Sequence, residues 1–193
     1  MGKSICAYYD DLKEFIGSIR VTDSSNKNID LNAGAEMMAK MVLDLNKKNS
    51  KLIFIGNGAS ASISSHQATD YWKNGGVRAV AFNDSSLLTC VSNDFGYQHV
   101  FEKPIEMFAD EGDILVAISS SGRSQNILNA VAMADKKGCK IITLSGFNSD
   151  NPLFKAGDLN FYVPSKEYSH VEIVHHSICH YILDIIIERK KGS

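Results

Sequence analysis

Several features are missing from this sequence of 193 residues, and each absence excludes a class of protein. The four cysteines are scattered and form no C-x-x-C pair, which argues against a disulfide framework or a zinc ribbon. No apolar run approaches the ~18 residues of a membrane span, and the first residues lack a signal-peptide core. Lysine and arginine number 20 against 22 acidic residues, so no basic surplus is present to bind nucleic acid. We therefore expect a reduced, cytoplasmic protein that binds neither membranes nor nucleic acid.

The composition that is present is typical of one folded domain. Apolar residues make up 44% of the chain and charged residues 22%, and no repeat or low-complexity segment occurs. Apolar positions recur at helical spacing over 4–20 and over 29–49, with a polar, turn-forming stretch between them. The sequence predicts a single domain over residues 1–193, in which N-terminal helices (1–49) precede an α/β core (50–193).

The core segment alternates between short apolar runs and helical patterns. Such alternation indicates a parallel sheet covered on both faces, and ligands of these folds bind at the carboxyl ends of the strands. The predicted strands are residues 52–56, 77–82, 113–119, 140–145 and 159–164.

Two turns at predicted strand ends are rich in groups that bind phosphate. The first combines Asn57 and Gly58 with Ser60, which opens a helix whose free backbone amides favour an anion. The second turn collects hydroxyls at the end of another strand, from Ser119, Ser120, Ser121 and Ser124. A cradle of this kind suits a phosphate monoester.

The two turns are also compatible with two other interpretations. The first turn fits the dinucleotide pattern G-x-G-x-x-A, and Asp84 follows the next strand, but the chain has no room for both a cofactor domain and a substrate domain. Serines also act simply as turn formers and helix caps. The density of hydroxyls at one strand end favours phosphate binding.

Histidines cluster near the end of the chain, where His170, His175, His176 and His180 share one predicted helix with Glu172. Glu172, His176 and His180 fall on one polar face of that helix. On an earlier helix, His66 and Asp70 have the i, i+4 spacing at which they can share a metal ion or a hydrogen bond. A single histidine is more often structural than a ligand, and His99 is interpreted as structural.

These residues together resemble a known family. The motifs are GNGAS, the helical His66 and Asp70, NDFGY, ISSSGRSQN and the final E-x-x-H-x-x-x-x-H. They are similar to the sugar isomerase (SIS) domain family, and within it to the phosphoheptose isomerases. The resemblance implies a three-layer α/β/α fold with a five-stranded parallel sheet and additional N-terminal helices. It also implies a homotetramer with active sites at subunit interfaces.

The resemblance further assigns roles to single residues. Zinc would be bound by His66, Asp70, Glu172 and His180, with Asp70 or Glu172 as the catalytic base and His180 as the acid. Beside the two turns, Asn93 and Asp94 would contact the substrate. The family has Glu at position 70, where this chain has the shorter Asp70. The family has Gln at position 172, where this chain has a second carboxylate, Glu172.

The activity implied is that of an aldose-ketose isomerase. It would convert sedoheptulose 7-phosphate to D-glycero-D-manno-heptose 7-phosphate, for lipopolysaccharide or capsule synthesis. The segment KEYSH before Glu172 departs from the family pattern, so isomerisation of another phosphosugar, such as a hexulose 6-phosphate, is one alternative. A non-catalytic phosphosugar-binding protein is the other. The retained histidines and carboxylates favour catalysis.

Overall fold

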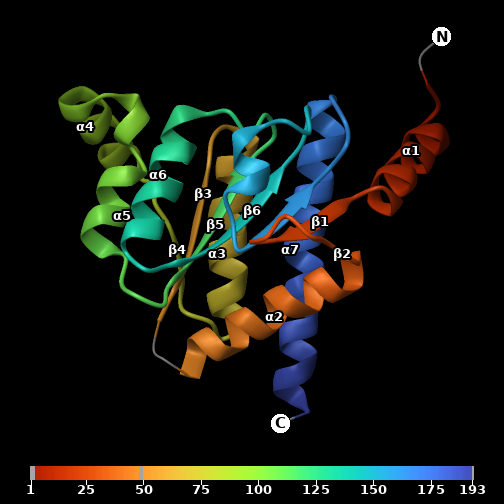
Figure 1. Cartoon of the computed structure of the whole chain (residues 1–193), viewed down its shortest axis with the longest axis horizontal. Coiled ribbons are helices and arrows are strands. Elements are labelled where there is room, and N and C mark those ends of the chain that lie inside the picture. Colours follow the sequence, from red (N-terminus) through yellow and green to blue (C-terminus); the bar gives the residue numbers. More distant parts are fainter. Residues whose placement is uncertain (1–2, 48–49, 193) are drawn as a thin grey trace.

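One seven-stranded sheet runs through the centre of the molecule (Figure 1). The structure, a computed structural model, describes residues 3–47 and 50–192. The order of the strands across the sheet is β2-β1-β7-β6-β5-β3-β4. The strands are β1 (Arg20–Asp23), β2 (Asn28–Ile29), β3 (Leu52–Gly56), β4 (Ala79–Ala81), β5 (Ile114–Ser119), β6 (Lys140–Ser145) and β7 (Leu159–Tyr162).

The five strands from β3 to β7 are parallel, which confirms the parallel core expected from the sequence. Each is a short apolar run, and those at the centre of the sheet are buried on both faces. Gly56 at the end of β3 pairs with Ile118, and Ser119 at the end of β5 pairs with Ser145. This register places the turns after β3 and β5 at the same edge of the sheet.

The hairpin β1–β2 corrects the sequence interpretation, which predicted a polar break there and a sheet of five strands. β1 joins the sheet antiparallel to β7, with Val21 opposite Phe161. The backbone amides of Ser25 and Lys27 donate to the Asp23 carboxylate and form the turn. Val21 and its neighbour Thr22 are buried in the sheet. The conformation of residues 20–23 is therefore decided by pairing with a strand some 140 positions further along the chain, as in Val21 with Phe161.

Helices cover both faces of the sheet and make the predicted three layers. Alternate strand residues point to opposite sides, Phe54 and Val116 into one core and Ile53 and Leu115 into the other. The first core is covered by α2 (Leu31–Lys47), α3 (Ala59–Lys73) and α7 (Tyr168–Lys191). The second is covered by α5 (Glu102–Phe108), which the sequence interpretation did not predict, and α6 (Gln125–Lys136).

The remaining helices lie at the periphery. α1 (Ile5–Gly17) begins at the N-cap Ser4 and lies apart at one end of the molecule (Figure 1). It contacts α7 through Tyr8 and Phe15, whose rings pack on His170. The last two residues of the predicted helix over 29–49 lie outside the described residues. α4 (Ser85–Phe95) and two 3-10 turns, η1 (Tyr97–His99) and η2 (Pro152–Lys155), complete the fold. Among the described helices, none has the length and apolarity needed to cross a membrane.

Candidate active site

The two phosphate-type turns enclose a polar cavity, which we call the serine cradle. The cavity measures about 250 Å³ and opens at the carboxyl ends of β3 and β5. Its lining comprises Asn57, Gly58, Ala59, Ser60, Ser119, Ser120, Ser121, Ser124, Tyr168 and Glu172. Every residue that the sequence predicted for the two turns therefore contributes to one cavity. Tyr168 was not predicted from the sequence.

Glycines determine the shape of the cradle. A side chain on Gly56 would place its Cβ 2.5 Å from the Ser60 carbonyl oxygen, so α3 can start directly above β3 only because position 56 is glycine. Gly58, with φ of 55°, is the N-cap of α3 and has no side chain to cap the helix. The first amides of α3 consequently remain available to an anion.

Asn57 is held in one orientation by a pair of reciprocal hydrogen bonds. Its amide nitrogen donates to Asn126 Oδ1 at 2.9 Å, and the Asn126 nitrogen donates back to Asn57 Oδ1 at 2.9 Å. Tyr97 donates its hydroxyl proton to the same Asn57 oxygen at 3.0 Å. Asn126 and Tyr97 were not singled out from the sequence, although both lie in the motifs ISSSGRSQN and NDFGY.

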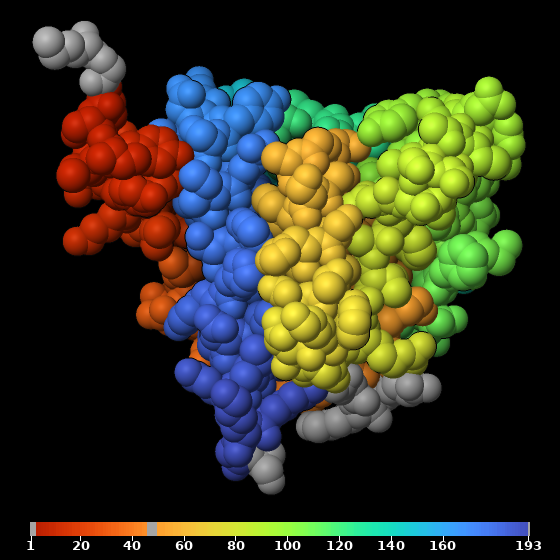
Figure 2. Space-filling view, turned by 180° about the vertical axis from the view of Figure 1, so that it is seen from behind, coloured from red at the N-terminus to blue at the C-terminus, as the bar shows by residue number. Residues whose placement is uncertain are grey.

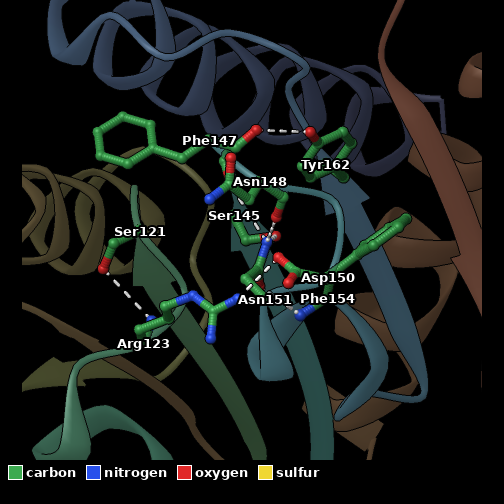
Figure 3. A network of polar contacts seen from close by, with 10 residues as sticks. Ser121, Arg123, Ser145, Phe147, Asn148, Asp150, Asn151, Phe154 and Tyr162 are labelled. Atoms are coloured by element: carbon green, nitrogen blue, oxygen red, sulfur yellow. Dashed lines mark hydrogen bonds and ion pairs between the residues drawn. The ribbon is translucent and has the colours of Figure 1, made fainter.

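The loop after β6 packs against the serine turn, the turn that carries Ser119 to Ser124 (Figure 3). Arg123 forms an ion pair with Asp150 at 2.7 Å. Asn151, which is fully buried, donates to the carbonyls of Gly146 and Asn148 and accepts from the Phe154 amide. Asn151 also packs against the turn itself, because a Cβ on Gly122 would lie 2.0 Å from Asn151 Oδ1.

A second group of polar side chains lies where α3 and α7 run side by side (Figure 2). His66 comes from α3, and His176 and His180 come from α7. One ring nitrogen from each lies within 4.8 Å of the other two, and we call this group the histidine cluster. Asp70 Oδ2 joins its edge, 3.2 Å from His66 Nε2 and 4.0 Å from His180 Nδ1. The structure thus brings together three of the four predicted zinc ligands, and adds His176.

Glu172, the fourth predicted ligand, is not part of the histidine cluster. It lies two turns before His180 on α7 and lines both the serine cradle and the neighbouring cavity beside His66 and His176. Partial burial raises the pKa of the Glu172 carboxyl, because a low-dielectric surrounding disfavours its charge. Burial, together with the neighbouring His180 and His66, lowers the pKa of His176 and favours its neutral form.

Other candidate residues lie away from the cradle. Asn93 and Asp94 are exposed on α4, where they line a shallow cavity with Cys90 and do not reach the cradle of the same chain. His99 contacts Glu102 and is not part of either group. His175 is buried in the core and hydrogen-bonded to the Ser145 carbonyl, and burial lowers its pKa to about 4.

Comparison with known proteins agrees with this architecture. The model of the SIS domain family matches residues 7–146. The chain belongs to the SIS domain family. Its curated relatives include the phosphoheptose isomerase of Histophilus somni, which is 35% identical over 169 residues, covering 84% of this chain and 85% of the relative. The phosphoheptose isomerase of Serratia proteamaculans is 35% identical over 186 residues, covering 93% and 96%.

Solved structures similar to this chain also include phosphoheptose isomerases. Phosphoheptose isomerase GmhA from Neisseria gonorrhoeae superimposes with a TM-score of 0.80 at 27% identity, covering 94% of this chain and 97% of that chain. A phosphoheptose isomerase from Francisella tularensis superimposes with a TM-score of 0.81 at 28% identity, covering 95% and 96%. The chain spans nearly the whole length of these proteins, so the resemblance noted in its motifs is confirmed over the entire fold.

Proposed function

We propose that this chain is a phosphoheptose isomerase, which converts sedoheptulose 7-phosphate to D-glycero-D-manno-heptose 7-phosphate for the synthesis of heptose-containing lipopolysaccharide or capsule. The observation that carries the proposal is the position of Glu172. It lines the serine cradle and also the cavity beside His66 and His176. The Glu172 carboxylate, which can transfer a proton, therefore lies between the proposed phosphate site and the histidine cluster. The similarity to phosphoheptose isomerases over most of the chain supports the same function.

The serine cradle would hold the phosphate of the substrate. The hydroxyls of Ser60, Ser119, Ser121 and Ser124 and the first amides of α3 are donors, and phosphate oxygens are acceptors. Arg123 is paired with Asp150, so neutral donors dominate the cradle. Such a site holds the phosphate end and leaves the sugar chain to extend toward Glu172 and the histidine cluster.

The reaction requires a base and an acid on either side of an enediol. A base removes a proton from C1 of the ketose, C2 receives a proton, and the proton of the C1 hydroxyl is transferred to the C2 oxygen. Glu172 and Asp70 are the two candidate bases. The raised pKa of the Glu172 carboxyl makes its carboxylate a stronger base than an ordinary Glu carboxylate, and His180 can supply the proton to oxygen.

The donor atoms of the histidine cluster fit a divalent metal such as zinc. Imidazole nitrogens from His66 and His180 and a carboxylate oxygen from Asp70 are ligands that zinc prefers. A bound zinc ion would supply Lewis acidity, which stabilises negative charge on the sugar oxygens. We further propose that the protein is a cytoplasmic homotetramer, in which Asn93 and Asp94 serve the site of a neighbouring subunit.

Deuterium incorporation tests the proposed activity. The purified protein, with and without zinc, is incubated in deuterated water with sedoheptulose 7-phosphate and a panel of ketose phosphates. We expect deuterium at the carbon next to the carbonyl, because the abstracted proton exchanges with solvent. His180→Ala should abolish exchange, while the matched variant His99→Ala, outside the site, should retain it. Sugar-phosphate binding without exchange on any ketose would instead support a non-catalytic binding protein.

The same assay identifies the base. If Asp70 is the base, Asp70→Asn abolishes exchange and leaves phosphate binding intact. If the role belongs to Glu172, Glu172→Gln is the more damaging change, although it introduces the residue that the family has. Exchange with a hexulose phosphate but not with the heptulose phosphate would reassign the substrate.

A further inference from the structure

His176 has a position that the proposed function does not use. It lies one helical turn before His180 on α7, so both side chains point to the same side of the helix. Their Nε2 atoms are 3.1 Å apart. The His176 ring also meets the His66 ring edge to face, with centroids 5.1 Å apart.

These distances agree with the geometry of a tetrahedral metal site. Two ligands at about 2.0–2.1 Å from a zinc ion stand roughly 3.3–3.4 Å apart along a tetrahedral edge. The nitrogen pair of His176 and His180 is within a few tenths of an ångström of that edge, and His66 provides a third nitrogen from α3. Three histidine nitrogens are a known protein ligand set for zinc.

Asp70 lies at the edge of this set, beside His66. Asn74 donates to its Oδ1 atom at 3.3 Å, whereas Oδ2 is 3.2 Å from His66 Nε2 and 4.0 Å from His180 Nδ1, the ring nitrogen of His180 that does not meet His176. Glu172 is placed differently, because eight residues of helix separate it from His180, about 12 Å along the axis. It lines the serine cradle, where a substrate would lie.

We propose that His176 is a metal ligand of this protein, so that a divalent ion is bound by His66, His176 and His180, with Asp70 completing the set and Glu172 left to the sugar phosphate. The inference rests on the proposed function for the identity of the site. Zinc binding is measured without turnover, so a failure of the His176 proposal can be distinguished from a failure of the proposed isomerase function.

The test is zinc affinity of the full-length protein. Protein freed of metal with a chelator is titrated with Zn²⁺ at neutral pH in competition with a chromophoric chelator. His176→Gln, which keeps a polar side chain of similar size, should weaken zinc binding by about 100-fold, because loss of supporting partners alone costs 10–100-fold. Glu172→Gln, on the same helix, should remain within about threefold of the unsubstituted protein, and so should His99→Gln.

The inference is overturned by unchanged zinc affinity in His176→Gln, or by a loss in Glu172→Gln as large as that in His176→Gln. Absence of zinc binding in the unsubstituted protein overturns it as well, while deuterium exchange without metal would leave the isomerase proposal standing. A second readout does not depend on the variant folding. In the unsubstituted protein, zinc should shift the NMR signals of three imidazole rings, and a shift of only two would contradict a role for His176.

Discussion

The hydroxyl of Ser121 accepts a hydrogen bond from the Arg123 amide at 3.3 Å, which leaves its own proton free to donate to a ligand. Ser119 ends β5 and is buried beside it. We predict that replacing both serines by alanine weakens binding of a sugar phosphate by a few kcal/mol, at about 1.5–3 kcal/mol per hydrogen bond to a charged group. Calorimetry measures the effect. Ser18→Ala at the end of α1 is the control, and equal affinity of all three proteins would contradict the assignment of the cradle.

The four thiols differ in their surroundings, and this predicts their reactivity. Burial raises the pKa of Cys139 to about 11 and the pKa of Cys179 to about 12, whereas Cys6 and Cys90 are exposed. Because the thiolate is the nucleophile, the raised pKa values keep Cys139 and Cys179 almost entirely in the unreactive thiol form at mildly alkaline pH. Mass spectrometry after brief alkylation should find Cys6 and Cys90 modified and the two buried cysteines intact. All should react in denaturant, and labelling of Cys179 in the native protein would show that α7 opens.

Among the elements, the serine turn and the loop after β6 depend on each other through Gly122 and Asn151. Gly122→Ala forces a left-handed φ of 60° on a side chain, at about 1–2 kcal/mol, and directs its Cβ at Asn151 Oδ1. Asn151→Ala removes the side-chain partner of the Phe154 amide and of the Gly146 carbonyl, at about 1–3 kcal/mol for a buried orphan group, while the Asn148 carbonyl still accepts from the backbone amide of residue 151.

Because Asn151→Ala also removes the atom that the new Cβ would meet, we predict that the double variant is less destabilised than the sum of the two single variants. Chemical denaturation of the four proteins measures this coupling. Strictly additive losses would mean that the turn and the loop respond independently.

At the scale of the whole molecule, apolar side chains remain exposed on the N-terminal helices and on α7. Ile5, Tyr9 and Ile16 of α1 and Tyr181 of α7 are each more than 40% exposed. An apolar cavity of about 420 Å³ lies among α1, α2 and α7, with Ile16 and Tyr181 in its lining. Such a surface is typical of an oligomer interface.

We predict that light scattering finds four times the mass of one chain, and that Ile16→Lys shifts the protein toward smaller species. A charge buried against an apolar partner surface is costly, which is the reason for the expected dissociation. Met107→Lys provides the control, since Met107 is equally apolar and 73% exposed on α5. A monomeric protein at all concentrations would refute the predicted tetramer.

The sequence by itself determined the parallel strands β3 to β7 and the turns at their ends. Short apolar runs bounded by glycine and serine are local signals, and the rule that ligands bind at carboxyl strand ends predicted the cradle from Asn57 to Ser124 without coordinates. Residues whose position depends on the local turn at a strand end, such as Ser119 and Ser121, could therefore be predicted from the sequence.

Only the tertiary structure decided which distant residues meet. The hairpin β1–β2 has a polar sequence and becomes part of the sheet because Val21 pairs with β7. His176 joins His66 and His180, and Glu172 is directed to the cradle, because α3 and α7 pack at one particular angle and offset. Periodicity shows which side chains share a face of one helix, but the distance to a second helix depends on how the buried side chains between them pack. That packing is a property of the whole core, which explains why the sequence could predict the members of the histidine cluster only in part.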